Sequence, residues 1–160
     1  MAHWTASDIP SQHGRTAVVT GTGGLGFQDA LALARAGANV VIAGRNPSKG
    51  AAAVDLIRQS VPDAKVVFGA LDLASLDSIE AFAERLRSSH DRLDLLINNA
   101  AVMAPPKRLA TADGFEMQFG TNYLGHFALT ARLLPLLRQG NQPRVVSLSS
   151  IAVARGRLNF

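Results

Sequence analysis

A glycine-rich turn between a buried strand and a helix constrains this chain most. An apolar, β-branched run at 16–20 leads into the turn, a helix-forming segment follows to residue 36, and a second apolar strand comes at 39–43. In this order, main-chain N–H groups and a helix N-terminus can hold a dinucleotide pyrophosphate. Glycine is needed there because side chains would keep phosphates from the backbone. The alternative is an ordinary strand-to-helix turn with extra glycines. The turn residues are Gly21, Thr22, Gly23, Gly24, Leu25 and Gly26.

Strands and helices are expected to alternate along the whole chain. Short, β-branched apolar runs predict strands at 16–20, 39–43, 65–69, 93–98 and 144–148. Apolar residues at helical spacing predict helices at 24–36, 47–59, 75–89 and 113–138, the last punctuated by Gly120, Gly125 and Pro135. This alternation predicts an α/β fold, a doubly wound parallel sheet of the Rossmann type, truncated after its fifth strand.

The length of 160 residues suits one domain with a sizeable core. We expect residues 1–14 to form an N-terminal extension and residues 15–160 to form a dinucleotide-binding domain that is incomplete at its C-terminus. The first residues lack the basic start and apolar stretch of a secretory signal, and no apolar run has the length of a membrane span. The prediction is a cytoplasmic protein without a membrane partner.

Composition excludes several classes of site. The chain has no cysteine, which rules out disulfides and thiolate-held metals. Its four histidines show no metal-ligand spacing, so no metal site is predicted, and His126 is interpreted as a packing or surface residue. The formal net charge is +4, but the basic residues are scattered along the chain. A nucleic-acid surface would gather them on one face, so none is predicted.

Several polar residues fall at the carboxyl ends of the predicted strands, where doubly wound sheets bind ligands. Arg45 follows the second strand, where a basic side chain suits the 2′-phosphate of NADP; the alternative is an ordinary exposed loop arginine. Asp72 contacts a cofactor or caps the following helix, and the two roles are compatible in one residue. Asn98 and Asn99 are turn formers or ligand contacts, since the alanines after them leave room. The pair Ser149-Ser150 is also compatible with a simple strand-end turn.

As a set, these segments resemble the short-chain dehydrogenase/reductase family, particularly its bacterial retinol-dehydrogenase-like branch. The matching segments are Trp4–Pro10, Thr20-Gly21 with Gly24-Leu25-Gly26, Asp72-Leu73, Asn98–Ala101, Phe119–Phe127 and Val145–Ser150. The resemblance implies a role for each residue. Gly21, Gly24 and Gly26 line the pyrophosphate, Asp72 lies at the adenine, and Leu73 belongs to the same cofactor site. Asn98, Asn99 and Ala100 border the ribose and steady the central sheet, Asn122 belongs to the catalytic relay, and Ser150 hydrogen-bonds the substrate oxygen.

The sequence departs from the family pattern at two functional points. The family uses a Tyr-x-x-x-Lys pair in which the tyrosine is the acid/base; here the one tyrosine is Tyr123, and Phe127 stands four residues later. The glycine turn is one residue shorter than the family's between its first two glycines. Gly21, Gly23 and Gly26 also fit the general G-x-G-x-x-G spacing.

The resemblance implies an oxidoreductase that moves hydride between NADP(H), favoured over NAD(H), and a small-molecule carbonyl or secondary alcohol. The sequence is expected to be a fragment or a natural truncation that lacks the Tyr-Lys pair and is itself inactive. It does not specify the substrate, and homo-oligomerisation stays open. One alternative is a non-catalytic module that binds a nucleotide, or a partner through its exposed last strand. Another is a methyltransferase with an adenosyl cofactor, against which Asn98–Ala101 and Ser149-Ser150 weigh.

Overall fold

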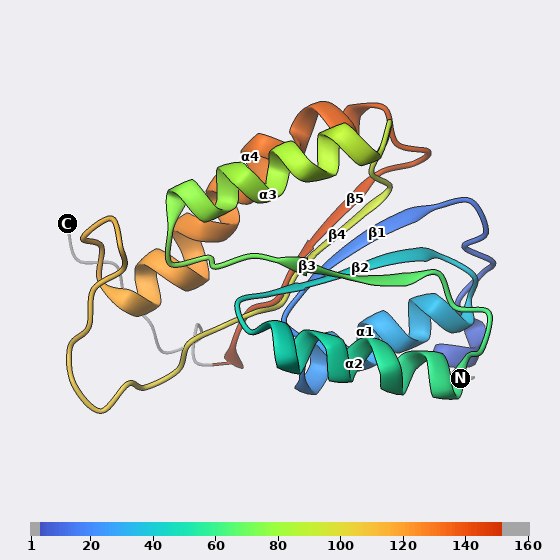
Figure 1. Ribbon diagram of the computed structural model, residues 1–160, viewed down its shortest axis with the longest axis horizontal. Helices are drawn as coiled ribbons and strands as arrows, with labels where there is room; N and C mark the ends of the chain where they lie inside the picture. The colour runs from blue at the N-terminus through green and yellow to red at the C-terminus, as the bar shows by residue number, and fades with distance from the viewer. Residues whose placement is uncertain (1–3, 152–160) are drawn as a thin grey trace.

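The computed structural model describes residues 4–151, and its centre is a five-stranded parallel sheet (Figure 1). The strands are β1 (Thr16–Thr20), β2 (Asn39–Gly44), β3 (Val66–Ala70), β4 (Leu95–Asn98) and β5 (Arg144–Ser147), in the spatial order β3-β2-β1-β4-β5. The order reverses between β1 and β4, and a crevice at the carboxyl ends of the strands is expected there. The predicted Rossmann-type sheet is confirmed, with strand bounds within two residues of those expected.

Helices cover both faces of the sheet. On one side are α1 (Gly24–Arg35) and α2 (Pro47–Ser60), and on the other α3 (Leu76–Ser89) and α4 (Gly125–Arg138) (Figure 1). Val18 of β1 is buried in the α3–α4 core, whereas its neighbours Ala17 and Val19 are buried in the α1–α2 core. Successive strand residues point to opposite faces, so a sheet covered twice needs continuous apolar strands. A short 3-10 helix, η1 (Ala6–Asp8), precedes β1.

Ser75 caps α3, and the alternative interpretation of Asp72 as that cap is wrong. The Ser75 side chain accepts the N–H of Ser78 at 3.3 Å. Asp72 Oδ1 instead accepts the N–H of Ala74 at 2.9 Å, in the turn before the helix. Short polar side chains can stabilise turns as well as cap helices. Here Asp72 stabilises the turn and Ser75 caps the helix.

The helix predicted at 113–138 begins later and is not uniform. Gly114 lies in a turn with a φ of 84°, and the helical residues begin at 117. The carboxylate of Glu116 accepts two main-chain N–H bonds, the shorter from Phe119 at 2.7 Å, and these bonds hold the pKa of Glu116 below its usual range. A π-helix, η2 (Phe119–Leu124), then leads into α4. Such wider turns are often found at functional sites.

Asp94 ties the amino-terminal end of the sheet together. The residue is fully buried, and its Oδ2 accepts the N–H of Thr16 at 2.7 Å. Its Oδ1 accepts the N–H of Asn141 at 2.6 Å. One carboxylate therefore joins the start of β1, the start of β4 and the turn before β5.

The two edges of the sheet differ in how they are covered. At the β3 edge, the Arg58 and Arg85 guanidinium groups donate to the Val66 and Ala70 carbonyl oxygens. On β5, all residues are exposed, and Val145 and Val146 are 45% and 47% exposed. Within the described residues, β5 is thus the apolar edge expected at 144–148, and an unpaired edge strand can pair with a further strand. Within residues 4–151, no helix is long and apolar enough to cross a bilayer.

Candidate functional site

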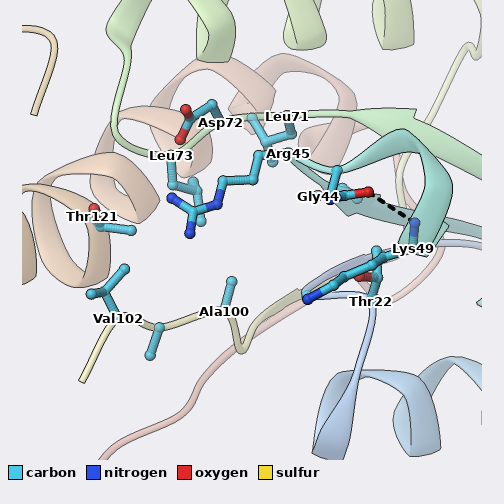
Figure 2. A pocket seen from close by; sticks show the side chains of 14 residues that line it. Thr22, Gly44, Arg45, Lys49, Leu71, Asp72, Leu73, Ala100, Val102 and Thr121 are labelled. Carbon is cyan, nitrogen blue, oxygen red and sulfur yellow. Dashed lines mark hydrogen bonds between the residues drawn. The ribbon is translucent and has the colours of Figure 1, made fainter. Parts of the chain in front are cut away.

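A cavity of about 270 Å³ lies at the carboxyl ends of β1, β2 and β4 (Figure 2). Its walls come from the turn after β1 and from the segments that follow β2, β3 and β4. These segments are far apart in the sequence, and the parallel sheet brings their starts to one edge. The predicted site residues that line the cavity are Gly21, Thr22, Arg45, Asp72, Leu73 and Ala100.

The inner part of the glycine turn rests on Asn99. The Asn99 Nδ2 donates to the Thr20 carbonyl oxygen at 2.8 Å, and a Cβ on Gly21 would lie 2.7 Å from that nitrogen. Gly21 also has a φ of 99°, which other residues rarely adopt. A Cβ on Gly26 would lie 2.6 Å from the Gly21 carbonyl oxygen. Gly21 and Gly26 are thus required by packing of the turn itself, and Asn99 supports the turn instead of lining the cavity.

The outer part of the turn is open. Gly23 and Gly24 are exposed, and a Cβ on either would meet no atom within 4 Å. Gly23 is the N-cap of α1, and a glycine cap has no side chain to occupy the first-turn N–H groups. Leu25, in the same turn, is 66% exposed. Free N–H donors and the positive end of the helix dipole make this corner suited to an anion.

Two cationic side chains border the cavity. Arg45 follows β2, and Figure 2 shows its guanidinium turned into the cavity on the side of Leu73. Lys49 stands in the first turn of α2, where its N–H donates to Asn46 Oδ1 at 3.0 Å, and its side chain passes beside Thr22. Among residues 4–151, neither side chain forms a hydrogen bond or ion pair. Sequence reasoning missed Lys49, although Asn46 and the following proline fix it in the first helical turn.

Asp72 and Leu73 form the wall across the cavity from Ala100 (Figure 2). Leu73 is buried, and Asp72 is partly exposed. The main-chain N–H of Asp72 donates to Ser78 Oγ at 2.9 Å, and this bond fixes Asp72 to the first turn of α3. A carboxylate beside an apolar side chain suits a flat ring with amine donors at its edge.

The segment after β4, Asn99–Val102, is held at both ends. Thr20 Oγ1 accepts the N–H groups of Asn99 and Ala100 at 2.9 and 3.0 Å. Asn122, on η2, accepts the Val102 N–H with Oδ1 and donates from Nδ2 to the Val102 carbonyl oxygen, both at 2.8 Å. Asn122 therefore holds Val102, a residue of the cavity wall, in place through two hydrogen bonds. Its assignment to a catalytic relay stays a prediction.

Asn98 and Ser150 lie apart from this cavity. Asn98 is buried, and its Nδ2 donates to Thr130 Oγ1 and Ser147 Oγ, both at 3.2 Å. Its Oδ1 is buried and has no hydrogen-bond partner in the described part of the chain. Asn98 lines a second hollow, beside β5, together with Asn122. Ser150 is exposed beyond β5 and lines neither hollow.

His126 is buried, in agreement with its interpretation as a packing residue, but its two side-chain hydrogen bonds were not predicted. Its Nε2 lies 3.0 Å from Thr20 Oγ1, and its Nδ1 lies 2.9 Å from the Asn122 carbonyl oxygen. Burial lowers the pKa of His126, and the bond to Asn122 opposes that shift with a smaller effect. The sequence signal for this role is the four-residue spacing from Asn122, one helical turn.

Known proteins match the chain along most of its length. Residues 15–160 match the family model described as short chain dehydrogenase. Retinol dehydrogenase 13 of Mus musculus is 47% identical over 148 residues, which cover 92% of this chain and 44% of that protein. Polyprenol dehydrogenase of Danio rerio is 44% identical over 158 residues, which cover 96% and 48%. The chain thus spans about half the length of these curated relatives.

Solved structures share the fold as well. An uncharacterised protein from Mycobacterium Paratuberculosis is 45% identical, with a TM-score of 0.85 over 99% of this chain and 54% of that chain. The Pseudomonas aeruginosa RhlG/NADP active-site complex is 32% identical, with a TM-score of 0.65 over 81% of this chain and 50% of that one. A metagenomic short-chain oxidoreductase in complex with NADP is 28% identical, with a TM-score of 0.75 over 88% and 64%. Sequence and fold agree with the resemblance, and the chain belongs to the short-chain dehydrogenase family.

Proposed function

We propose that this chain binds a nicotinamide dinucleotide in the cavity at the glycine turn, with NADP(H) preferred to NAD(H). In this proposal the chain is the cofactor-binding part of an oxidoreductase acting on a small-molecule carbonyl or secondary alcohol. One observation carries the proposal: Arg45 and Lys49 line the cavity, and Lys49 and Thr22 also line an adjoining hollow at the open N-terminus of α1. Family membership supports it independently.

The diphosphate belongs at the outer part of the turn. Gly23 and Gly24 leave open space, and the N–H groups of the first turn of α1 are the donors that a phosphate needs. Ala100 adds a methyl group where a larger side chain would fill the cavity, so the ribose has room beside it. Asp72 and Leu73 then border the adenine.

Arg45 carries the proposed preference for NADP(H). A guanidinium recognises a phosphate through charge-assisted bonds, and a 2′-phosphate is the feature that NADP has and NAD lacks. Lys49 adds a second positive charge to the lining of the cavity. The two related proteins whose solved structures contain NADP support this preference by analogy.

The remaining residues prepare the reaction. When bound, the dinucleotide supplies or takes up the hydride. Asn122 holds the wall at Val102, so we expect its substitution to act first on cofactor binding. Ser150 offers a hydroxyl that can hydrogen-bond a substrate oxygen, as the family resemblance implies.

Titration of NADPH and NADH into the wild-type chain tests the proposal. We expect NADPH to bind more tightly, and Arg45→Ala to remove most of the difference, about 1–3 kcal/mol for a charge-assisted phosphate contact. Arg35→Ala is the matched control, because Arg35 is exposed at the far end of α1. Equal affinities of the wild type for the two nucleotides would exclude the assigned role of Arg45, and no binding of either would exclude the proposal.

A non-catalytic binding module is the second candidate. The observation that favours it is the exposed apolar surface of η2, α4 and β5, on which Tyr123 and Phe127 are 58% and 65% exposed. Such a surface is typical of a site where another polypeptide packs. Both candidates predict dinucleotide binding without turnover by these 160 residues, so self-association in analytical ultracentrifugation is the measurement that would favour the binding module.

A further inference from the structure

His126 lies at the centre of a buried network that connects the glycine turn, the wall after β4 and η2. The imidazole is 7% exposed, and it bridges residues more than one hundred positions apart in the sequence, Thr20 and Asn122. Neither the glycine turn nor the dinucleotide chemistry requires a histidine at this place. The positions of the protons on His126 and Thr20 determine which hydrogen bonds the imidazole supports.

The Asn122 carbonyl oxygen can only accept a hydrogen bond, so His126 Nδ1 carries a proton. In the neutral ring, Nε2 is then an acceptor, and the one hydroxyl proton of Thr20 points to it across 3.0 Å. The Ile97 carbonyl oxygen competes for that proton at 3.3 Å, a longer contact. With the proton directed to His126, both lone pairs of Thr20 Oγ1 are free to accept the Asn99 and Ala100 N–H groups.

A charged imidazole would break this pattern. Its Nε2–H would be a third donor directed at Thr20 Oγ1, which already accepts two N–H groups and has only two lone pairs. The direction of the pKa of His126, lowered by burial, agrees with the neutral ring. The network is fully satisfied in one protonation state only, and a satisfied buried network fixes a single geometry.

We infer that His126 is a positioning residue for the dinucleotide site, since its neutral imidazole orients the Thr20 hydroxyl and joins it to the Asn122 carbonyl. Through Thr20, the ring fixes the first two residues of the wall Asn99–Val102. Through η2, it fixes Asn122, whose side chain clamps Val102 at the other end. The part of the inference that concerns ligand affinity rests on the proposed dinucleotide binding.

Three variants of the full chain separate positioning from packing. His126→Leu keeps a similar volume and removes the acceptor for the Thr20 proton. His126→Gln keeps an amide oxygen at about the place of Nε2. Leu133→Ala is the control, because Leu133 is fully buried in the same helix and touches none of the network's hydrogen bonds. If His126→Leu does not fold, His126→Asn replaces it, since its amide is too short to reach Thr20.

Amide hydrogen exchange without ligand is the first measurement. We expect the Asn99 and Ala100 amides to exchange about tenfold faster in His126→Leu, the factor for one lost hydrogen bond, and within about threefold of wild type in His126→Gln. The Asn141 amide, bound to Asp94 at the opposite end of the sheet, is the internal reference because it lies far from the network. Equal acceleration of all three amides would mean a structural role alone and overturn the inference.

The second measurement is the Kd for NADPH, determined by fluorescence titration. We expect His126→Leu to weaken binding about tenfold, His126→Gln to stay within about threefold, and Leu133→Ala to lower stability with Kd unchanged. Wild-type affinity in His126→Leu, or equal losses in the leucine and glutamine variants, would overturn the inference. Failure of the wild type to bind any dinucleotide would overturn the proposed function instead, and the exchange measurement would still decide the role of His126.

Discussion

Removing the Asp94 carboxylate should destabilise this fold more than any other single charge change at the amino-terminal end of the sheet. Its two oxygens each accept a main-chain N–H, from Thr16 at 2.7 Å and from Asn141 at 2.6 Å, and the side chain is fully buried. A buried hydrogen bond to a charged group is worth about 1.5–3 kcal/mol, so Asp94→Ala should lower the free energy of unfolding by about 3–6 kcal/mol. Domains of this size have only about 5–15 kcal/mol in total.

Asp94→Asn divides that loss. Its amide oxygen can accept one N–H, but its NH₂ group faces the other donor, so about 2–4 kcal/mol should be lost. Asp91→Ala is the control for charge, because Asp91 is exposed on the same loop, and it should stay within about 0.5 kcal/mol of wild type. Urea unfolding followed by circular dichroism measures all three. A loss below about 1 kcal/mol for Asp94→Ala would refute the reasoning, because the buried Thr16 N–H would be left without a partner.

Burial lowers the pKa of His126 from 6.5, so the unfolded chain binds the proton first. The free energy of unfolding should therefore fall below pH 6.5 by up to about 1.4 kcal/mol per pH unit, and the difference between wild type and His126→Gln in urea unfolding across pH should show it. Insertion of one residue between Thr22 and Gly23 should strengthen dinucleotide binding, because the turn is shorter than the family's; weaker binding in titration would mean that the present turn is the working one. A polypeptide of these 160 residues should show no NADPH-dependent reduction of an aldehyde and ketone panel, since the sequence contains no Tyr-x-x-x-Lys pair to supply the acid/base of the family; turnover by the pure monomer would contradict this.

The sequence was sufficient to predict the sheet and its order of elements. Apolar strand runs and helical stripes alternate along the chain. This periodicity is local, so it can be recognised without knowing the tertiary contacts. The predicted helix start at 113 was wrong because the spacing of apolar residues carries no information about capping. The Glu116 carboxylate caps the helical turn that begins after it. The alternative cap role of Asp72 failed for a similar reason, since Ser75 stands closer to the helix.

The site was predicted in part, and the missing part consists of contacts between distant segments. The cavity residues at the ends of β1, β2 and β3 could be found because a parallel sheet places such ends together. The bond between Thr20 and His126 joins positions 106 residues apart, and nothing in the local sequence of either residue indicates it. Asn99 was expected to border the ribose and to steady the central sheet. Its side chain bonds the end of β1 under the glycine turn, in agreement with the second role, and its ribose contact stays a prediction.

The glycines of the turn show why a sequence pattern alone cannot separate packing from ligand contact. Gly21 and Gly26 are glycine because Asn99 and the turn's own backbone leave no room for a Cβ. Gly23 and Gly24 face open space at the start of α1, where an anion would approach. The spacing of the inner pair is therefore fixed by the protein, whereas the outer pair sets which N–H groups are presented. A residue inserted between Thr22 and Gly23 changes the outer part of the turn, while Asn99 keeps the inner glycines in place. A change in the dinucleotide affinity of this variant therefore reports on the geometry of the phosphate site alone.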